Sequence, residues 1–240
     1  MDIYDKIDLH IHTTESSDGH SSLFEIVEKA KNLNYSLIGI TEHDFYNKEL
    51  MQILKSQRNN IFIYKNQKVI VGAEFNFNAI HVLVFPRNYQ SALKIANEKN
   101  NADLIEFIEL CSNENSITIL AHPFRFKQLL KHGFSKMKNL IEKTDFFEFI
   151  NGRSILSNIL TNTYFKKEKY NNISLAGSDS HHVYELGNAF TLINELELSS
   201  FDDFYNSLKT SKRKNVFSPN MYSLIYSRYL KLRKKLFPKR

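Results

Sequence analysis

The stretch Ile7–Gly19, IDLHIHTTESSDG, contains the pattern from which the fold of this 240-residue chain can be inferred. Its first residues, Ile7–Ile11, form a short β-rich run. His10 and His12 stand two positions apart, so on a strand both side chains point to the same face, where two imidazoles can bind one divalent ion. This spacing is a weak signal by itself, because nine histidines in 240 residues produce such pairs by chance. The positions of the other polar residues therefore decide the interpretation.

Similar β-rich runs recur along the chain and alternate with amphipathic stretches. The runs are Ile7–Ile11, Leu37–Thr41, Val69–Glu74, His81–Phe85, Ile117–Ala121, Phe146–Ile150 and Ile173–Gly177. After the first run the apolar residues change to helical spacing over residues 23–33, with Ser21 or Ser22 as the N-cap. This alternation predicts an α/β fold with parallel strands and helices outside them, and the length suits a single α/β barrel.

The composition is typical of a globular protein, with 42% hydrophobic and 24% charged residues. Cys111 is the only cysteine, so no internal disulfide can form. The uncharged apolar runs are far shorter than the ~18 residues that indicate a membrane span. The first residues also lack the basic and apolar segments of a secretory signal. We therefore expect a cytoplasmic protein.

The net charge of +6 is unevenly distributed along the chain. Residues 204–240 contain eleven of the 32 Lys and Arg and none of the 26 Asp and Glu, which leaves 21 basic against 26 acidic residues in 1–203. A nucleic-acid interface over the whole protein therefore does not follow from its net charge. We predict a barrel domain over residues 1–203 and a basic, helical C-terminal extension over residues 204–240.

Histidines and acidic residues follow the other predicted strands at the point where each strand ends. His43 lies in GITEHD, Glu74 in VGAEF, His122 in LAHPF, and Asp179 and His181 in AGSDSH. In a closed α/β barrel the carboxyl ends of all strands converge on one face, where active sites are built. We therefore expect these side chains, although far apart in the sequence, to meet in space.

In this order, the motifs H-x-H-T, ITEHD, GAE, a following histidine, AHP and GSDSH resemble those of the polymerase and histidinol phosphatase (PHP) family. The resemblance extends from about Ile7 to Gly187, and EFINGR and GSDSHHVYELG are similar to the phosphoesterase branch of that family. It implies a distorted seven-stranded (β/α)7, TIM-like barrel that holds two or three metal ions and hydrolyses phosphate esters.

The resemblance also implies the metal ligands. A first metal would be bound by His10, His12, Glu74 and Asp179. Glu74 would bridge to a second metal, completed by His81 and His122. A third metal would be held by Asp18, His43 and His181, with Asp18 standing where some relatives have histidine.

The residue types support the same interpretation without the family. Imidazoles and carboxylates without a thiolate favour zinc, manganese or iron, and one bridging carboxylate brings two metals close together. Arg125 and Arg153 are the best-placed arginines for phosphate, unless they are solvent-exposed loop residues. His182 could protonate a leaving group or could support a ligand from outside. The candidate catalytic residues are therefore Glu74, Asp179, Arg125, Arg153 and His182.

Several other residues have simpler interpretations. Asp44 is expected to support a neighbouring ligand, and Cys111 has the helical spacing of a core residue. Glu148 and Asn151 either orient a ligand or cap a strand end.

We therefore expect a metal-dependent hydrolase, either a phosphatase for a nucleotide or phosphorylated metabolite or a nuclease for the end of an oligonucleotide. Two alternatives remain open: a catalytically inert PHP-like module that binds metal or a partner, and an amidohydrolase-type C–N hydrolase. The amidohydrolases usually bridge their metals with a lysine, for which this sequence has no obvious counterpart.

The basic extension also has two interpretations. Tyr222, Ile225, Tyr229, Leu232 and Leu236 recur at helical spacing among basic residues. Such a helix can pack its apolar stripe on the barrel, or its charge can recruit a nucleic acid or an anionic membrane surface. We favour nucleic acid, because the metal ligands already imply a phosphate substrate.

Overall fold

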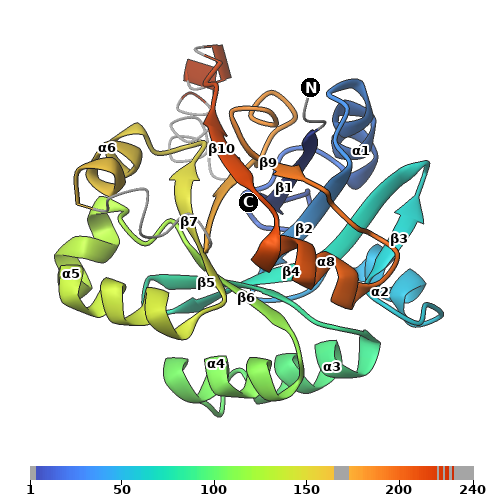
Figure 1. Ribbon diagram of the computed structural model, residues 1–240, viewed down its shortest axis with the longest axis horizontal. Coiled ribbons are helices and arrows are strands. Elements are labelled where there is room, and N and C mark those ends of the chain that lie inside the picture. The colour runs from blue at the N-terminus through green and yellow to red at the C-terminus, as the bar shows by residue number, and fades with distance from the viewer. Residues whose placement is uncertain (1–3, 165–172, 221, 224, 227–228, 230–240) are drawn as a thin grey trace, which may run out of the picture.

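The computed structural model describes residues 4–164 and 173–220, together with residues 222–223, 225–226 and 229 (Figure 1). Its strands are β1 (Tyr4–Ile11), β2 (Leu37–His43), β3 (Ile61–Tyr64), β4 (Gln67–Phe77), β5 (Ile80–Phe85), β6 (Ile117–Ala121), β7 (Phe146–Asn151), β8 (Ser174–Gly177), β9 (Ala189–Asn194) and β10 (Arg213–Phe217). Its helices are α1 (Leu23–Asn32), α2 (Lys48–Leu54), α3 (Tyr89–Glu98), α4 (Leu104–Asn113), α5 (Phe126–Lys143), α6 (Ile155–Tyr164) and α8 (Phe201–Thr210). The predicted α/β class is confirmed.

The strands of the described residues form one mixed sheet in the order β10-β9-β1-β2-β4-β5-β6-β7-β8, with β3 paired to β4. The two ends of the main run approach each other, because Ile11 at the end of β1 bridges Ser180 just after β8. There the backbone N–H of His12 donates to the carbonyl of Ser180 at 2.8 Å. The sheet is therefore a nearly closed barrel, and α1 to α6 lie around its outside (Figure 1).

All seven predicted strands are present, but one of them does not run parallel to its neighbours, and the sheet contains further strands. The short strands β3, β9 and β10 are added, and β5 runs antiparallel to both β4 and β6. The reversal is made by a two-residue turn, Asn78–Ala79, in which both residues have positive φ, 55° and 73°. Turns of this kind match the twist of a hairpin. Consequently the start of β5, rather than its end, faces the mouth of the barrel.

Alternating residues of each strand divide the core into an inner and an outer layer. Val69 and Val71 of β4 pack in the outer cluster with the helices, whereas Ile70 between them belongs to the inner cluster. Phe85 fills the inside of the barrel so tightly that a Cβ on Gly72 would lie 2.6 Å from its ring. Glycine at this position is therefore required by the close approach of the ring and the strand.

The predicted C-terminal extension begins inside an element of the barrel. α8 spans the boundary at residues 203 and 204, and it packs Phe201, Phe204 and Leu208 into the inner cluster. Residues 213–217, expected to be helical, form β10 because they pair antiparallel with β9. Residues 204–217 of the predicted extension are therefore part of the sheet, through β10, and of helix α8, which packs against it.

Beyond β10, the described residues between 222 and 229 are helical, as predicted. Of the apolar stripe, Tyr222, Ile225 and Tyr229 are 60%, 65% and 55% exposed, although the Tyr222 ring contacts the Tyr184 ring edge-on. Ser223 is the buried residue instead, and its hydroxyl donates to the side chain of Asn188. Leu232 and Leu236 lie outside the described residues.

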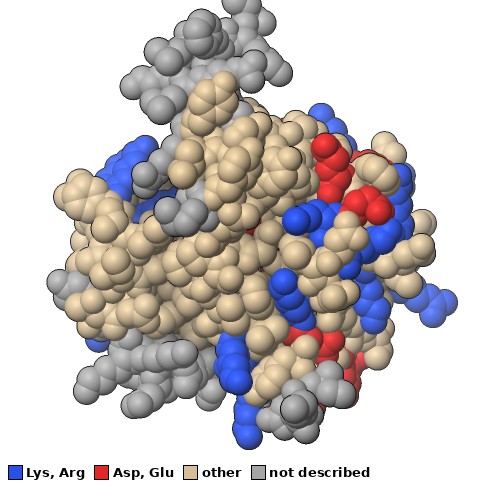
Figure 2. Space-filling model, turned by 90° about the horizontal axis from the view of Figure 1, so that it is seen from above, with Lys and Arg blue, Asp and Glu red and all other residues tan. Residues whose placement is uncertain are grey.

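Charged residues are not spread evenly over the face of the molecule that Figure 2 shows. In Figure 2, Lys and Arg side chains on the right, the side of α1 and α2 in Figure 1, are interspersed with Asp and Glu, while uncharged residues dominate the left. None of the helices in the described part of the chain is both long and apolar enough to cross a membrane.

Candidate metal centre

His10, near the end of β1, and His12, just after it, place two imidazoles at the mouth of the barrel. His10 and His12 are fully buried, and their Nε2 atoms lie 3.1 Å apart. Nδ1 of His10 lies 2.7 Å from Oε1 of Glu148, where the imidazole N–H donates to the carboxylate. With one proton held on Nδ1, the lone pair of Nε2 would be left for a metal ion once an ion replaces the second proton of the ring.

Glu74 on β4 lies at the centre of the cluster. Its Oε1 atom is 2.7 Å from Nδ1 of His81 and 3.0 Å from Nε2 of His122, and its Oε2 atom is 2.9 Å from Nδ1 of His43. The register of β2 on β4 places His43 directly opposite Glu74. Burial raises the pKa of Glu74, but the charge of His10 and hydrogen bonds from the imidazoles hold it well below its usual range. Glu74 is therefore an ionised, buried carboxylate.

Asp179 follows β8 and closes another side of the cluster. Its Oδ1 atom lies 3.7 Å from Nε2 of both His10 and His12. Arg125 forms an ion pair with Oδ2, and Nη1 of Arg153 lies 3.8 Å from Oδ1. Burial raises the pKa of Asp179, but Arg125, His10 and Arg153 together hold it well below its usual range. This carboxylate is also ionised.

Asp18 joins two further imidazoles at the edge of the site. Its oxygens lie 3.0 Å from Nε2 of His43 and 3.0 Å from Nε2 of His181. Partial burial raises the pKa of Asp18, but the hydrogen bonds from His181 and His43 lower it far more. Burial lowers the pKa of His43, but Asp18 and Glu74 raise it to about 10. These contacts tie Asp18 to the same charged network as Glu74.

The nine predicted ligands thus lie in one cluster of contacts, and all of them except His10, His12 and His122 line one cavity. Among the described residues, three groups have candidate ligand atoms within 4.8 Å of one another: His10, Glu74 and His122; His10, His12 and Asp179; and His12, His43 and His181. The groups share members, so ions held by them would lie close together, as in two-metal sites. The assignment of each ligand to a particular ion stays a prediction.

Backbone strain marks the loops that carry several of these residues. His122, Asp179 and Asp44 have φ values of 32°, 54° and 59°, in the left-handed region that side chains rarely adopt. The strained loop of His122 is held by Glu148, which accepts a hydrogen bond from the His122 N–H at 2.9 Å. Strain of this kind persists only where surrounding contacts over-determine it, which is common at functional sites.

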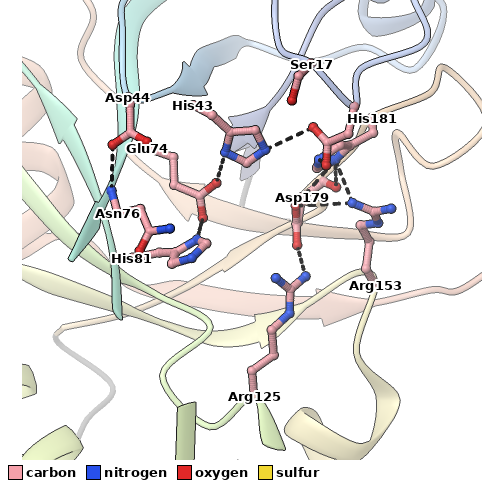
Figure 3. Close-up of a pocket in the computed structure, with 11 residues that line it drawn as sticks. Ser17, His43, Asp44, Glu74, Asn76, His81, Arg125, Arg153, Asp179 and His181 are labelled. Atoms are coloured by element: carbon pink, nitrogen blue, oxygen red, sulfur yellow. Dashed lines mark hydrogen bonds and ion pairs between the residues drawn. The ribbon is translucent and has the colours of Figure 1, made fainter. Parts of the chain in front are cut away.

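Arg125 and Arg153 both line the cavity, and both point toward Asp179. Figure 3 shows both guanidinium groups reaching toward Asp179, Arg125 from below and Arg153 from the right. The Arg153 side chain is only 11% exposed, and its Nε atom donates to Glu185 at 3.2 Å. The cavity has a volume of about 340 Å³ and is lined by Ser17, Asp18, His43, Asp44, Glu74, Asn76, His81, Arg125, Arg153, Asp179 and His181.

Three other predicted residues, His182, Asn151 and Cys111, do not line the cavity. His182 stacks on Tyr184 and is not among the residues that line the cavity. Asn151 is buried and donates to Glu148 at 3.2 Å. Cys111 is buried, and burial raises the pKa of its thiol above the ordinary value.

Two buried carboxylates in these motifs were not predicted to support the site. Glu42 accepts hydrogen bonds from the hydroxyls of Thr13 and Ser16 and from Asn47 at 3.1 Å, and the Ser16 hydroxyl lies 3.4 Å from Nδ1 of His12. Glu42 directly precedes His43 in ITEHD, and that position was the available signal.

Asp8 is the second of these carboxylates. It accepts hydrogen bonds from the backbone N–H groups of His10 and Ser178, each at 3.1 Å, and so joins β1 to the loop after β8. Burial raises its pKa to about 7. The available signal was its spacing, two residues before His10, which places it on the same face of β1.

The sequence profile of the PHP domain matches residues 8–174. The chain belongs to the PHP domain family. A second profile, described as PHP-associated, matches residues 167–212. An uncharacterized protein of Methanocaldococcus jannaschii is 31% identical over 119 residues, which are 45% of this chain and 49% of that protein. The chain therefore spans about half the length of this curated relative.

The chain also superposes on solved structures of other proteins. PsfC from Pseudomonas syringae superposes with a TM-score of 0.69 at 15% identity, over 98% of this chain and 99% of that one. The lesion-specific endonuclease PfuEndoQ from Pyrococcus furiosus superposes with a TM-score of 0.66 at 18% identity, over 89% of this chain and 58% of that one. At these identities the similarity shows the fold alone.

The donor set of this PHP domain fits divalent metal ions. Buried groups of imidazole nitrogens and ionised carboxylate oxygens converge within 4.8 Å, and the groups that form them contain no thiolate. Mixed nitrogen and oxygen ligands of this kind suit zinc, manganese or iron. Without a cation, so many converging donor groups in a buried site would be costly to keep.

Proposed function

We propose that this protein is a phosphoesterase that uses two or three divalent metal ions held by its nine converging ligands. The observation that carries the proposal is the position of Glu74, whose two oxygens face imidazoles from three different elements at 2.7–3.0 Å. A buried carboxylate with imidazoles on both oxygens has the arrangement of a ligand that bridges two metals.

Divalent ions bound by these ligands would supply Lewis acidity and would make a water molecule acidic enough to serve as the nucleophile at neutral pH. The chain supplies the ligands and their orientation. Glu148 holds the proton of His10 on Nδ1, so that Nε2 is the donor atom. Asp179 ties the ligand cluster to Arg125 and thereby fixes the distance between the ligands and the arginine side chain.

Arg125 and Arg153 would bind the non-bridging oxygens of the phosphate. Both line the cavity, and a guanidinium can make two parallel hydrogen bonds to a phosphate. Their positive charge would stabilise the negative charge that develops on the phosphoryl group during hydrolysis. A role for His182 as proton donor stays a prediction, because in the structure its ring packs against Tyr184 and Tyr226.

Two substrate classes fit this site: a nucleotide or other small phosphomonoester, and the terminal nucleotide of an oligonucleotide. The second class is favoured by the exposed Tyr222 and Tyr229, because aromatic and basic residues together bind single strands through stacking and charge. The structural similarity to an endonuclease is compatible with this class.

The test is metal analysis of the purified protein combined with assays on phosphomonoesters, phosphodiesters and short oligonucleotides. Release of inorganic phosphate would identify a phosphatase, and release of mononucleotides would identify a nuclease. A protein that binds metal but hydrolyses none of these would instead be an inert PHP-like module. Hydrolysis of C–N bonds alone would point to an amidohydrolase-type activity.

A further inference from the structure

Gln128, in the first turn of α5, is a buried polar side chain beside a predicted metal ligand. It is 2% exposed, and its Nε2 atom lies 3.3 Å from Nδ1 of His122. Its Oε1 atom is buried without a hydrogen-bond partner among the described residues. Leaving a buried polar atom unpaired is destabilising, so the unused oxygen of this amide calls for an explanation.

The contact of Nε2, on the other side of the His122 ring, indicates which hydrogen bond Gln128 has to form with Nδ1. Nε2 of His122 lies 3.0 Å from Oε1 of Glu74, and both residues belong to one of the three candidate ligand groups. When an imidazole binds a metal through Nε2, its proton must lie on Nδ1, and that N–H requires an acceptor. His10 has such an acceptor in Glu148, at 2.7 Å from its Nδ1.

An amide can serve His122 in either tautomer. With the proton on Nε2, His122 donates to Glu74 and accepts at Nδ1 from the Gln128 amide N–H. With the proton on Nδ1, half a turn of the amide brings Oε1 to the position of Nε2, where it accepts that proton. A carboxylate could only accept the proton of the Nδ1–H tautomer, and an aliphatic side chain could pair with neither tautomer. Of these three side-chain types, only glutamine can form a hydrogen bond with both tautomers of His122.

We propose that Gln128 is a positioning residue that holds His122 as the Nδ1–H tautomer and thereby makes Nε2 the ligand atom of the metal shared with Glu74. The proposal rests on the metal centre of the proposed function but not on its substrate. It assigns a role to a residue that does not line the cavity and is reached only through His122.

Two substitutions and one matched control test this role. Gln128→Leu removes the acceptor at similar volume, and Gln128→Glu keeps an acceptor. Gln67→Leu is the control, because Gln67 is also buried, at 3% exposure, but its amide donates to the carbonyls of Tyr35 and Lys68, away from the metal ligands. Each metal-free protein is titrated with Zn²⁺ and with Co²⁺, and the nitrogen NMR signals of His122 are recorded in the zinc-loaded protein.

We expect Gln128→Leu to weaken the binding of one ion by about 10- to 100-fold and to leave the others unchanged, as is typical when the partner of a metal-bound imidazole is lost. Gln128→Glu should bind all ions about as tightly as the wild type, and Gln67→Leu should lose stability but not metal affinity. In the wild type, NMR should show His122 protonated at Nδ1 and metal-bound at Nε2.

Wild-type affinity for every ion in Gln128→Leu, or metal bound at Nδ1 of His122, would overturn the proposal. An equal loss of affinity in Gln67→Leu would also overturn it, since the effect would then be one of general packing. Should Gln128→Leu fail to fold, the NMR signals and Gln128→Glu decide. Metal binding as expected without hydrolysis of any phosphate ester would overturn the proposed function and leave the role of Gln128 intact, whereas a wild type that binds no Zn²⁺ would overturn both.

Discussion

Glu74→Gln changes one oxygen of the central carboxylate to an NH2 group and removes its negative charge. In the structure Oε1 faces His81 and His122 at 2.7 and 3.0 Å, and Oε2 faces His43 at 2.9 Å, so an amide can place an acceptor on only one of the two sides. A lost interaction with a charged partner costs about 1.5–3 kcal/mol, which corresponds to about 10- to 150-fold in affinity for one ion. Loss of the ligand charge adds to this cost.

The expected result is a folded protein with fewer bound ions and a turnover reduced at least about 100-fold. The barrel core remains in place, because the neighbours of Glu74 in β4, Ala73 and Phe75, are unchanged. Metal content is measured on the purified protein, folding by far-UV circular dichroism, and turnover on the best substrate of the phosphate-ester panel. Glu49→Gln serves as the control, because Glu49 is a carboxylate that accepts from the Tyr64 hydroxyl and does not line the cavity.

Normal metal content together with full turnover in Glu74→Gln would refute the assignment of Glu74 as the bridging ligand. Glu74→Asp keeps the charge and shortens the side chain by one methylene, so it should retain more metal than Glu74→Gln. If the Gln variant does not fold, the Asp variant answers the same question. A Glu49→Gln variant that also loses metal would show that the readout is not specific to the site.

Three further predictions concern substrate binding and the barrel. Arg125→Ala and Arg153→Ala should each lower kcat/KM by about 10- to 150-fold, the value of about 1.5–3 kcal/mol for a charged hydrogen bond, with metal content normal; an unchanged kcat/KM would return that arginine to a structural role. A chain ending at Ser218 should hydrolyse a mononucleotide normally but an oligonucleotide poorly and with a weaker salt dependence; equal loss on both would make residues beyond 218 part of the fold. Gly72→Ala should lower the free energy of unfolding by about 1–3 kcal/mol in urea denaturation, because the added Cβ would lie 2.6 Å from the Phe85 ring. Adding Phe85→Leu should recover part of this loss. Strictly additive effects of the two changes would contradict the contact.

Elements governed by neighbouring residues could be predicted with little error. β6 has the predicted bounds Ile117–Ala121. α1 begins after Ser22, one of the two predicted N-caps, because Ser22 and Glu25 form a capping box within a single turn. The direction of β5 was missed because its antiparallel course depends on an Asn78–Ala79 turn, which lacks the glycine that usually signals a hairpin.

The order of histidines and acidic residues along the chain determined, by itself, that a polar site would form at one end of a β/α barrel. This was possible because strand ends converge in a barrel whatever the details of its packing. His81 lies at the same site for a different reason: it stands at the start, not the end, of its strand, and this strand is antiparallel, so that His81 pairs with Asn76 of β4.

Only the tertiary structure decided how these side chains are supported. The hydrogen bond between His10 and Glu148 joins residues 138 positions apart, and the one between Ser178 and Asp8 joins residues 170 positions apart. Gln128 likewise meets His122 only because α5 begins over the strained loop after β6. The sequence shows which residues can bind a metal, but their tautomers, charges and partners depend on burial and on contacts between distant segments, and those exist only once the barrel has closed.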